Sequence, residues 1–119
     1  MSTLKLVLKN HWFNEIKSGR KTHEYREVKP YWVQRIMMNV REQVYMLNWV
    51  NNNGNYDECP CWLYCCNKVE FRNGYRKNAE KMLFWVKSIN VVNGIDTDLK
   101  IDKPVFDIEL WDEVKKEDS

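Results

Sequence analysis

An Asn-Gly pair at positions 73 and 74 separates two stretches of the chain that are rich in aromatic and β-branched residues. The first stretch runs from Trp62 to Phe71, and the second runs from Tyr75 to Val92. An Asn-Gly pair between two such stretches is the strongest short-range signal for a β-hairpin, because a type I′ turn needs a positive φ at both central residues. The sequence therefore predicts two long antiparallel strands joined by a tight turn.

Two further strands are predicted near the ends of the chain. In residues 3–9 leucines alternate with other residues, which is the period of a strand with one buried face. A second Asn-Gly pair, at 93 and 94, is predicted to end the second hairpin strand, and the apolar residues between 105 and 110 supply a closing strand. The charged residues 112–119 are expected to form a frayed C-terminal tail.

Short helices are predicted before the hairpin. Asn10 stands at an N-cap position, apolar residues recur at helical spacing through residues 11–18, and Gly19 follows where a helix C-terminus favours a positive φ. Pro30 suits the first turn of a second helix, which the apolar spacing carries to about residue 39.

Residues 40–50 fit two interpretations. Val40, Val44 and Leu47 follow a helical stripe, whereas the aromatic and β-branched content is also typical of a strand. We favour a helix, followed by a turn-rich loop at 51–55.

Together these elements predict an α+β fold in a single domain, residues 1–119: a small, mostly antiparallel β-barrel with two or three short helices packed against it. A chain of 119 residues is long enough for one hydrophobic core. No apolar run approaches the roughly 20 residues that cross a bilayer, and the N-terminus lacks the features of a secretory signal. We therefore expect a cytoplasmic protein without a membrane partner.

The basic charge is concentrated in the first two-thirds of the chain. Residues 1–78 carry 13 Lys and Arg against 7 Asp and Glu, whereas residues 79–119 carry 6 against 10. A basic region of this kind suits a polyanionic partner such as RNA, although small domains also show such an imbalance without one.

The segment "KSGRKTHEYRE", residues 17–27, holds the candidate binding site. Read as a strand after Gly19, it directs Glu24 and Arg26 to one face, with Lys21 where the strand begins. A carboxylate can accept from the amino group of a base, and a guanidinium can hold a phosphate or a carbonyl. For catalysis, a desolvated Lys21 would serve as a base or Glu24 as a proton shuttle. The alternative is a structural salt bridge.

Other residues are candidates for contact with a ligand. Trp12, Tyr25, Trp32 and Tyr75 are expected to offer stacking surfaces, although the spacing of Trp12 also fits the core. The predicted hairpin turn carries a possible clamp for an RNA backbone, the alternative being an ordinary solvated turn. The residues of this clamp are Arg72, Asn73, Tyr75, Arg76 and Lys77. His11 and His23 have a suitable intrinsic pKa for acid-base chemistry, but no partner for either is identifiable from the sequence.

The order of these signals resembles the ASCH domain family, of the PUA-like fold, in its small bacterial and phage forms. "HWFNEIKSGRKTHEYRE" looks like the helix of that family followed by its G-x-K-x-x-x-x-R motif, here Gly19, Lys21 and Arg26, and "PVFDIELWDE" looks like its closing strand. The resemblance covers most of the chain, and residues 40–66 fit it least well.

This resemblance implies a barrel with a cleft that binds RNA, a nucleotide or a modified nucleoside, with Gly19, Lys21, Glu24, Tyr25 and Arg26 at the cleft. It also implies possible hydrolase activity, as an amidohydrolase acting on N4-acetylcytidine or as a single-strand ribonuclease. Lys21 matches the lysine of the amidohydrolases, but Glu24 stands where they have threonine. A third hypothesis is an interaction protein, of phage or bacterial origin, whose segment 40–66 contacts a protein partner.

Four cysteines fall within "CPCWLYCC", at positions 59, 61, 65 and 66. Structural zinc sites normally use two C-x₂₋₄-C pairs separated by a loop, and the spacing here is C-x-C-x₃-C-C. We therefore expect reduced thiols rather than a zinc site or a disulfide, and we expect no metal and no cofactor.

Overall fold

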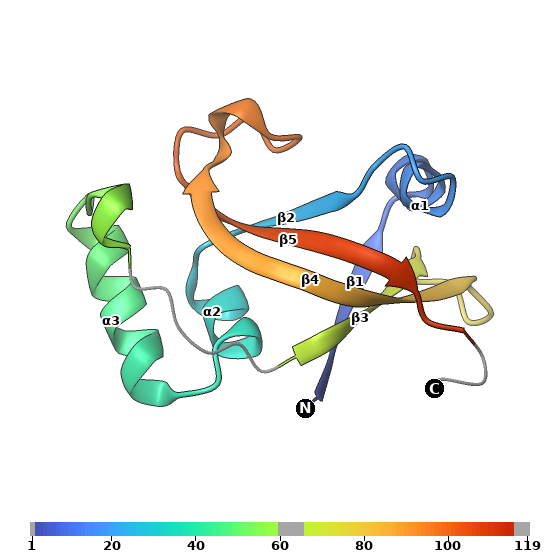
Figure 1. Ribbon diagram of the computed structural model, residues 1–119, viewed down its shortest axis with the longest axis horizontal. Helices are drawn as coiled ribbons and strands as arrows, with labels where there is room; N and C mark the ends of the chain where they lie inside the picture. Colours follow the sequence, from blue (N-terminus) through green and yellow to red (C-terminus); the bar gives the residue numbers. More distant parts are fainter. Residues whose placement is uncertain (1, 60–65, 116–119) are drawn as a thin grey trace.

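The computed structural model describes residues 2–59 and 66–115. The described elements follow one another as β1 (Ser2–Leu8), α1 (Asn10–Lys17), β2 (His23–Glu27), α2 (Pro30–Ile36), α3 (Val40–Asn51), the 3₁₀ turn η1 (Tyr56–Glu58), β3 (Cys66–Asn73), β4 (Lys81–Asn93), the 3₁₀ turn η2 (Gly94–Asp96) and β5 (Pro104–Glu113) (Figure 1). The predicted α+β class is therefore confirmed.

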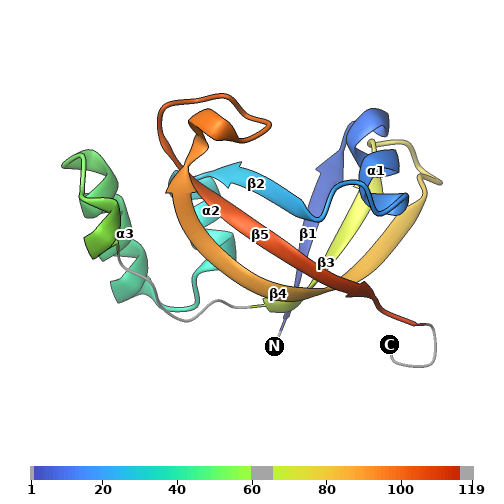
Figure 2. The same cartoon turned by 45° about the horizontal axis from the view of Figure 1, so that its top comes forward.

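The five described strands form one sheet in the order β1-β3-β4-β5-β2. β1 pairs with β3 in parallel, and the other three pairings are antiparallel, as the sequence predicts for most of the sheet. The sheet curls into a half-barrel, and Figure 2 shows the long strand β4 curving with it. β4 shifts its register against β5 twice, between Phe84 and Val86 and between Val86 and Ser88, and such irregularities bend a strand. The two edge strands, β1 and β2, make no ladder with each other.

The core fills the inside of this curl. Leu4, Leu6 and Leu8 of β1 are all buried, which confirms the alternation in the sequence. They belong to one hydrophobic cluster, to which α1, α2, α3, β3, β4 and β5 also contribute buried residues. β2 contributes none, but Val28, the residue after it, belongs to the cluster. Both α1 and α2 therefore pack their apolar faces onto the same core as the sheet.

The predicted hairpin exists, but its turn is different. β3 pairs with β4 antiparallel, whereas β4 begins at Lys81 rather than at Tyr75, so residues 74–80 form a longer loop. Gly74 has a φ of +76°, but Asn73 does not share a positive φ and stays in β3, so the type I′ prediction is wrong. The Gly74 N–H donates to the carbonyl of Leu8 at 2.9 Å, which ties this loop to the end of β1. The part of the first predicted strand before Cys66 lies outside the described residues.

Residues 40–50 are helical, as we favoured, and of the three stripe residues only Leu47 packs against the core. Val40 is 74% exposed and Val44 is 52% exposed, whereas Met46 is the buried residue of the helix. The helix packs mainly against α2, and Figure 1 shows it standing away from the sheet. The outer face of this helix therefore packs against no part of the core. The apolar spacing alone does not show which face of a helix meets the core.

The remaining boundaries differ by a few residues. Asn10 is the first residue of α1 rather than its cap, and its Oδ1 accepts from the Asn73 side-chain amide at 2.9 Å. α2 ends at Ile36, and β5 continues to Glu113, so the first two residues of the predicted tail belong to a strand. Among the residues that the structure describes, no helix is long and apolar enough to cross a membrane.

Candidate functional site: a groove between the two edge strands

The start of β2 places the G-x-K-x-x-x-x-R segment at the opening of the half-barrel. Gly19 ends α1 with a φ of +84°, a conformation that glycine adopts at little cost. The Lys21 N–H then donates back to the carbonyl of Glu15 at 3.0 Å, and the Leu110 N–H donates to the carbonyl of Thr22 at 2.9 Å. These bonds fix the path of the chain just before β2 begins to pair with β5.

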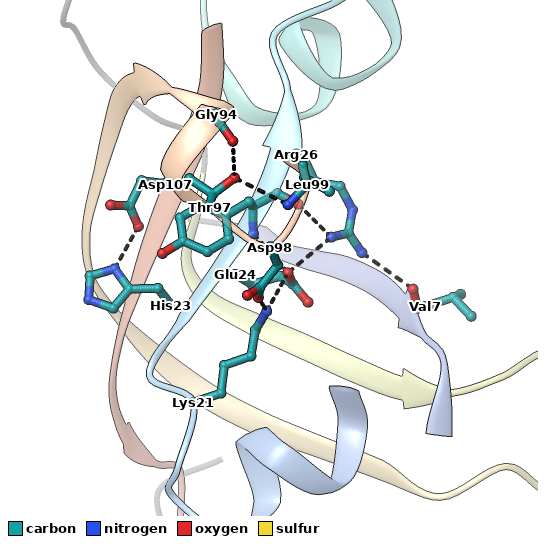
Figure 3. A network of polar contacts seen from close by, with 11 residues as sticks. Val7, Lys21, His23, Glu24, Arg26, Gly94, Thr97, Asp98, Leu99 and Asp107 are labelled. Atoms are coloured by element: carbon teal, nitrogen blue, oxygen red, sulfur yellow. Dashed lines mark hydrogen bonds and ion pairs between the residues drawn. The ribbon is translucent and has the colours of Figure 1, made fainter. Parts of the chain in front are cut away.

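Glu24 lies at the centre of a buried charge cluster, which Figure 3 shows from close by. Glu24 is 4% exposed, and its Oε1 accepts a hydrogen bond from the Tyr25 N–H at 2.8 Å. The same oxygen lies 3.3 Å from Lys21 Nζ and 3.5 Å from Arg26 Nη1. The three residues that the sequence selected therefore converge, and their charges face one another.

Arg26 connects the two edge strands. Its Nη1 donates to the carbonyl of Tyr25 at 2.7 Å, and its Nη2 donates across the opening to the carbonyl of Val7 in β1 at 3.3 Å (Figure 3). Burial lowers the pKa of Arg26 from its ordinary value, and the nearby carboxylate of Glu24 opposes this effect. The guanidinium stays charged at neutral pH and forms a hydrogen bond between two edge strands that do not pair with each other.

The Lys21 ammonium is enclosed on several sides. It forms an ion pair with Asp98, in addition to the contact with Glu24, and it lies 4.4 Å from the ring centre of Trp12 and 5.4 Å from that of Tyr25. Its side chain is 10% exposed. The N–H groups of Lys21 are thus directed at two carboxylates, and this arrangement positions β2 against α1 and the β4–β5 loop.

The β4–β5 loop that carries Asp98 is built around Gly94 and Thr97. The Thr97 hydroxyl donates to the Gly94 carbonyl at 2.8 Å and accepts from the Leu99 N–H at 3.2 Å. A Cβ on Gly94 would lie 2.6 Å from a methyl of Val105 and 2.9 Å from the carbonyl of Ile101, so the loop packs too closely there for any side chain. Sequence reasoning missed Asp98, because no local pattern connects it with a lysine 77 residues earlier.

Three adjoining hollows surround Arg26 and Tyr25. The largest, of about 510 Å³, is lined by Lys5, Val7, Arg26, Lys29, Tyr31, Trp32 and Tyr75. It lies where β1 and β2 face each other, and its lining contains three cationic side chains, three aromatic rings and no carboxylate. We call it the basic hollow.

A middle hollow of about 320 Å³ shares Arg26, Lys29 and Trp32 with the basic hollow, and Tyr25, Glu27, Leu99 and Ile101 complete its lining. Beyond Tyr25 lies an end hollow of about 350 Å³, lined by Trp12, Glu15, Arg20, Lys21, Thr22, His23, Tyr25 and Asp98. The end hollow mixes both signs of charge, whereas the basic hollow carries only one.

The five residues of the predicted RNA clamp do not lie together at one hollow in the structure. Tyr75 is 86% exposed and lines the basic hollow beside Arg26, so the loop and β2 do meet. Arg72 instead holds the loop together, since its guanidinium donates to the carbonyls of Gly74 and Arg76. Asn73 is bonded to Asn10, and Arg76 and Lys77 are exposed but line none of the three hollows.

His23 has a partner that the sequence did not reveal. Its Nδ1 lies 2.6 Å from Asp107 Oδ1 on the neighbouring strand β5, and its Nε2 lies 3.9 Å from Glu109 Oε2. Its ring is nearly parallel to that of Tyr25. Burial, followed by the charges of Asp107, Asp98 and Glu24, raises the pKa of Tyr25. The exposed His11 contacts Trp12.

The cysteine segment is described only in part. Cys59 is half-buried and Cys66 is buried, whereas Cys61 and Cys65 lie outside the described residues. Within residues 2–59 and 66–115, no three His, Cys, Asp or Glu side chains gather as metal ligands would.

Comparison of the chain with models of protein families, with curated proteins and with solved structures finds no match.

Proposed function

We propose that this protein binds RNA, or a nucleotide or modified nucleoside, in the groove between β1 and β2. The observation that carries the proposal is the lining of the basic hollow, where Lys5, Arg26 and Lys29 stand beside Tyr31, Trp32 and Tyr75 without any carboxylate. Cationic side chains neutralise phosphates, and aromatic rings stack on bases, so the two together match the two parts of a nucleotide.

The half-barrel with helices on its core also supports a small PUA-like domain of the ASCH type as the fold and family of this chain. In this proposal the ligand lies over the opening that Arg26 bridges. Glu24 then holds Arg26 in position through their ion pair. It does not contact the ligand, since it lines none of the three hollows.

Neutralising Lys5 and Lys29 together tests the binding proposal. Both lysines are exposed and lie in the basic hollow, so a Lys5→Gln/Lys29→Gln double variant should remove phosphate contacts without loss of packing. We expect affinity for a labelled single-stranded RNA, measured by fluorescence anisotropy, to fall by about tenfold, and the slope of log K against log salt to decrease by about 1.4.

The matched control is Lys87→Gln/Lys115→Gln, which removes the same net charge from exposed positions outside the three hollows. This control should keep nearly all of the affinity. Equal loss in both double variants would show that binding depends on net charge alone, and the groove would no longer be the proposed site.

We propose hydrolysis as a second candidate function, because His23 lines the end hollow with Lys21 and Thr22 and its Nδ1 is paired with Asp107 of the neighbouring strand β5. An Nδ1–H that donates to Asp107 leaves Nε2 to accept a proton from an attacking water. Incubation with N4-acetylcytidine and with labelled single-stranded RNA tests this. Product that forms with the wild type and is lost in His23→Gln supports it, whereas product that persists in His23→Gln, or never forms, removes it.

A further inference from the structure

The three hollows form a row along β2 rather than separate sites. Arg26, Lys29 and Trp32 line both the basic and the middle hollow, and Tyr25 lines both the middle and the end hollow. Neighbouring hollows therefore share side chains in their walls.

Each hollow has at least one aromatic ring in its lining. Tyr31 and Tyr75 are exposed at the basic hollow, and Trp32 lines both the basic and the middle hollow. Tyr25 and Trp12 line the end hollow, where each ring also contacts the Lys21 ammonium. Every base has a face that can stack on such a ring, so a series of rings suits successive unpaired bases. A duplex hides those faces within its own stack and cannot use them.

The charges follow the same row. Cations occur in all three hollows, whereas Glu15 and Asp98 lie in the end hollow and Glu27 in the middle one. The phosphates are therefore best held at the basic hollow. The end hollow, where carboxylates can accept from N–H groups, suits the edge of a base better than a phosphate.

We infer that the ligand of this groove is a single-stranded nucleic acid that places about three successive bases along β2, from Tyr75 at one end to Trp12 at the other. This inference rests on the proposed function and specifies its ligand class: an unpaired phosphodiester chain rather than a free nucleotide or a duplex.

Length dependence tests this ligand class directly. Fluorescein-labelled oligonucleotides of random sequence, from one to six nucleotides long, are titrated against the full chain by anisotropy, as one RNA series and one DNA series. We expect affinity to rise at least about fivefold for each nucleotide added up to the third and to level off afterwards. Unlabelled duplex should compete poorly with the trimer. A rise in either series supports the inference, and the series that rises identifies the sugar.

The other outcomes separate the two proposals. A labelled mononucleotide that binds as tightly as the trimer, or a duplex that competes as well as a single strand, overturns this inference while nucleotide or nucleic-acid binding stands. A complete lack of binding at every length overturns both proposals.

A variant locates one end of the strand. Tyr75→Ala removes an 86% exposed ring, so the fold should tolerate it, and we expect the gain between the dimer and the trimer to disappear. Trp111→Ala, which removes a ring that is 59% exposed outside the three hollows, is the control and should keep that gain. If Tyr75→Ala keeps the full gain, the strand does not extend to the hairpin loop and the inferred course along β2 is wrong.

Discussion

Glu24→Gln is expected to lower the free energy of unfolding by about 3 to 5 kcal/mol, because it removes the carboxylate shared by two poorly solvated cations. The side chains of Lys21 and Arg26 are 10% and 17% exposed, and their Nζ and Nη1 lie 3.3 and 3.5 Å from the same Glu24 oxygen. A glutamine keeps an acceptor for the Tyr25 N–H but leaves the positive charges without this partner. Urea unfolding followed by circular dichroism measures the loss.

Glu80→Gln is the matched control for this prediction. Glu80 pairs with Lys17 at 2.6 Å, but both side chains are about half exposed, so the expected loss is at most about 1 kcal/mol. A second substitution, Lys21→Met, should cost less stability in the Glu24→Gln background than in the wild type, because Lys21 and Glu24 contact each other directly, while the Asp98 partner of Lys21 is lost in both backgrounds. Similar losses in Glu24→Gln and Glu80→Gln would show that the cluster does not stabilise the barrel opening.

Arg26→Lys is expected to lower the free energy of unfolding by about 1 to 3 kcal/mol even though the charge is kept. Arg26 donates at once to the carbonyls of Tyr25 and Val7, one on each edge strand. A single ammonium group cannot reproduce this fork, so one carbonyl loses its donor and β1 loses its link to β2. Hydrogen exchange should show faster exchange of β1 amides in this variant.

Arg20→Lys provides the comparison for Arg26→Lys. The Arg20 side chain is 68% exposed and pairs with Glu15, so its replacement by lysine should cost less than about 1 kcal/mol. Equal stability of the two variants, with unchanged exchange in β1, would mean that the edge strands are held together without the guanidinium.

The structure bears on both the structural and the binding interpretation of the G-x-K-x-x-x-x-R segment. The sequence left open whether Lys21, Glu24 and Arg26 form a salt bridge or contact a ligand. In the structure they form a salt-bridge cluster, while Arg26 also lines the basic hollow and Lys21 the end hollow. The cluster thus stabilises the floor of the groove, and the proposed ligand contacts come mainly from the exposed side chains around it.

The hypothesis that segment 40–66 contacts a protein partner stays a prediction. α3 exposes Val40, Val44 and Tyr45 on its outer face, which is compatible with such a contact. Residues 60–65 of the segment lie outside the described part of the chain.

The sequence by itself determined those features that depend on neighbouring residues. Alternating leucines predicted β1, and Gly19 marked the end of α1, because strand faces and positive φ values are local properties of the chain. The same reasoning selected Lys21, Glu24 and Arg26, which lie within one short segment. It failed at the Asn73-Gly74 turn, since the bond from Gly74 to Leu8 of β1 is a tertiary contact.

Only the tertiary structure decided which distant residues complete the site. Asp98 reaches Lys21 across the β4–β5 loop, Val7 accepts from Arg26 because the sheet curls its two edges toward each other, and Tyr75 joins the groove through a loop tied to β1. Hydrophobic periodicity reports which face of an element is buried and carries no information about which elements meet. The close packing of the loop around Gly94 and the bends in β4 determine which elements lie side by side. Both features depend on contacts between residues far apart in the chain.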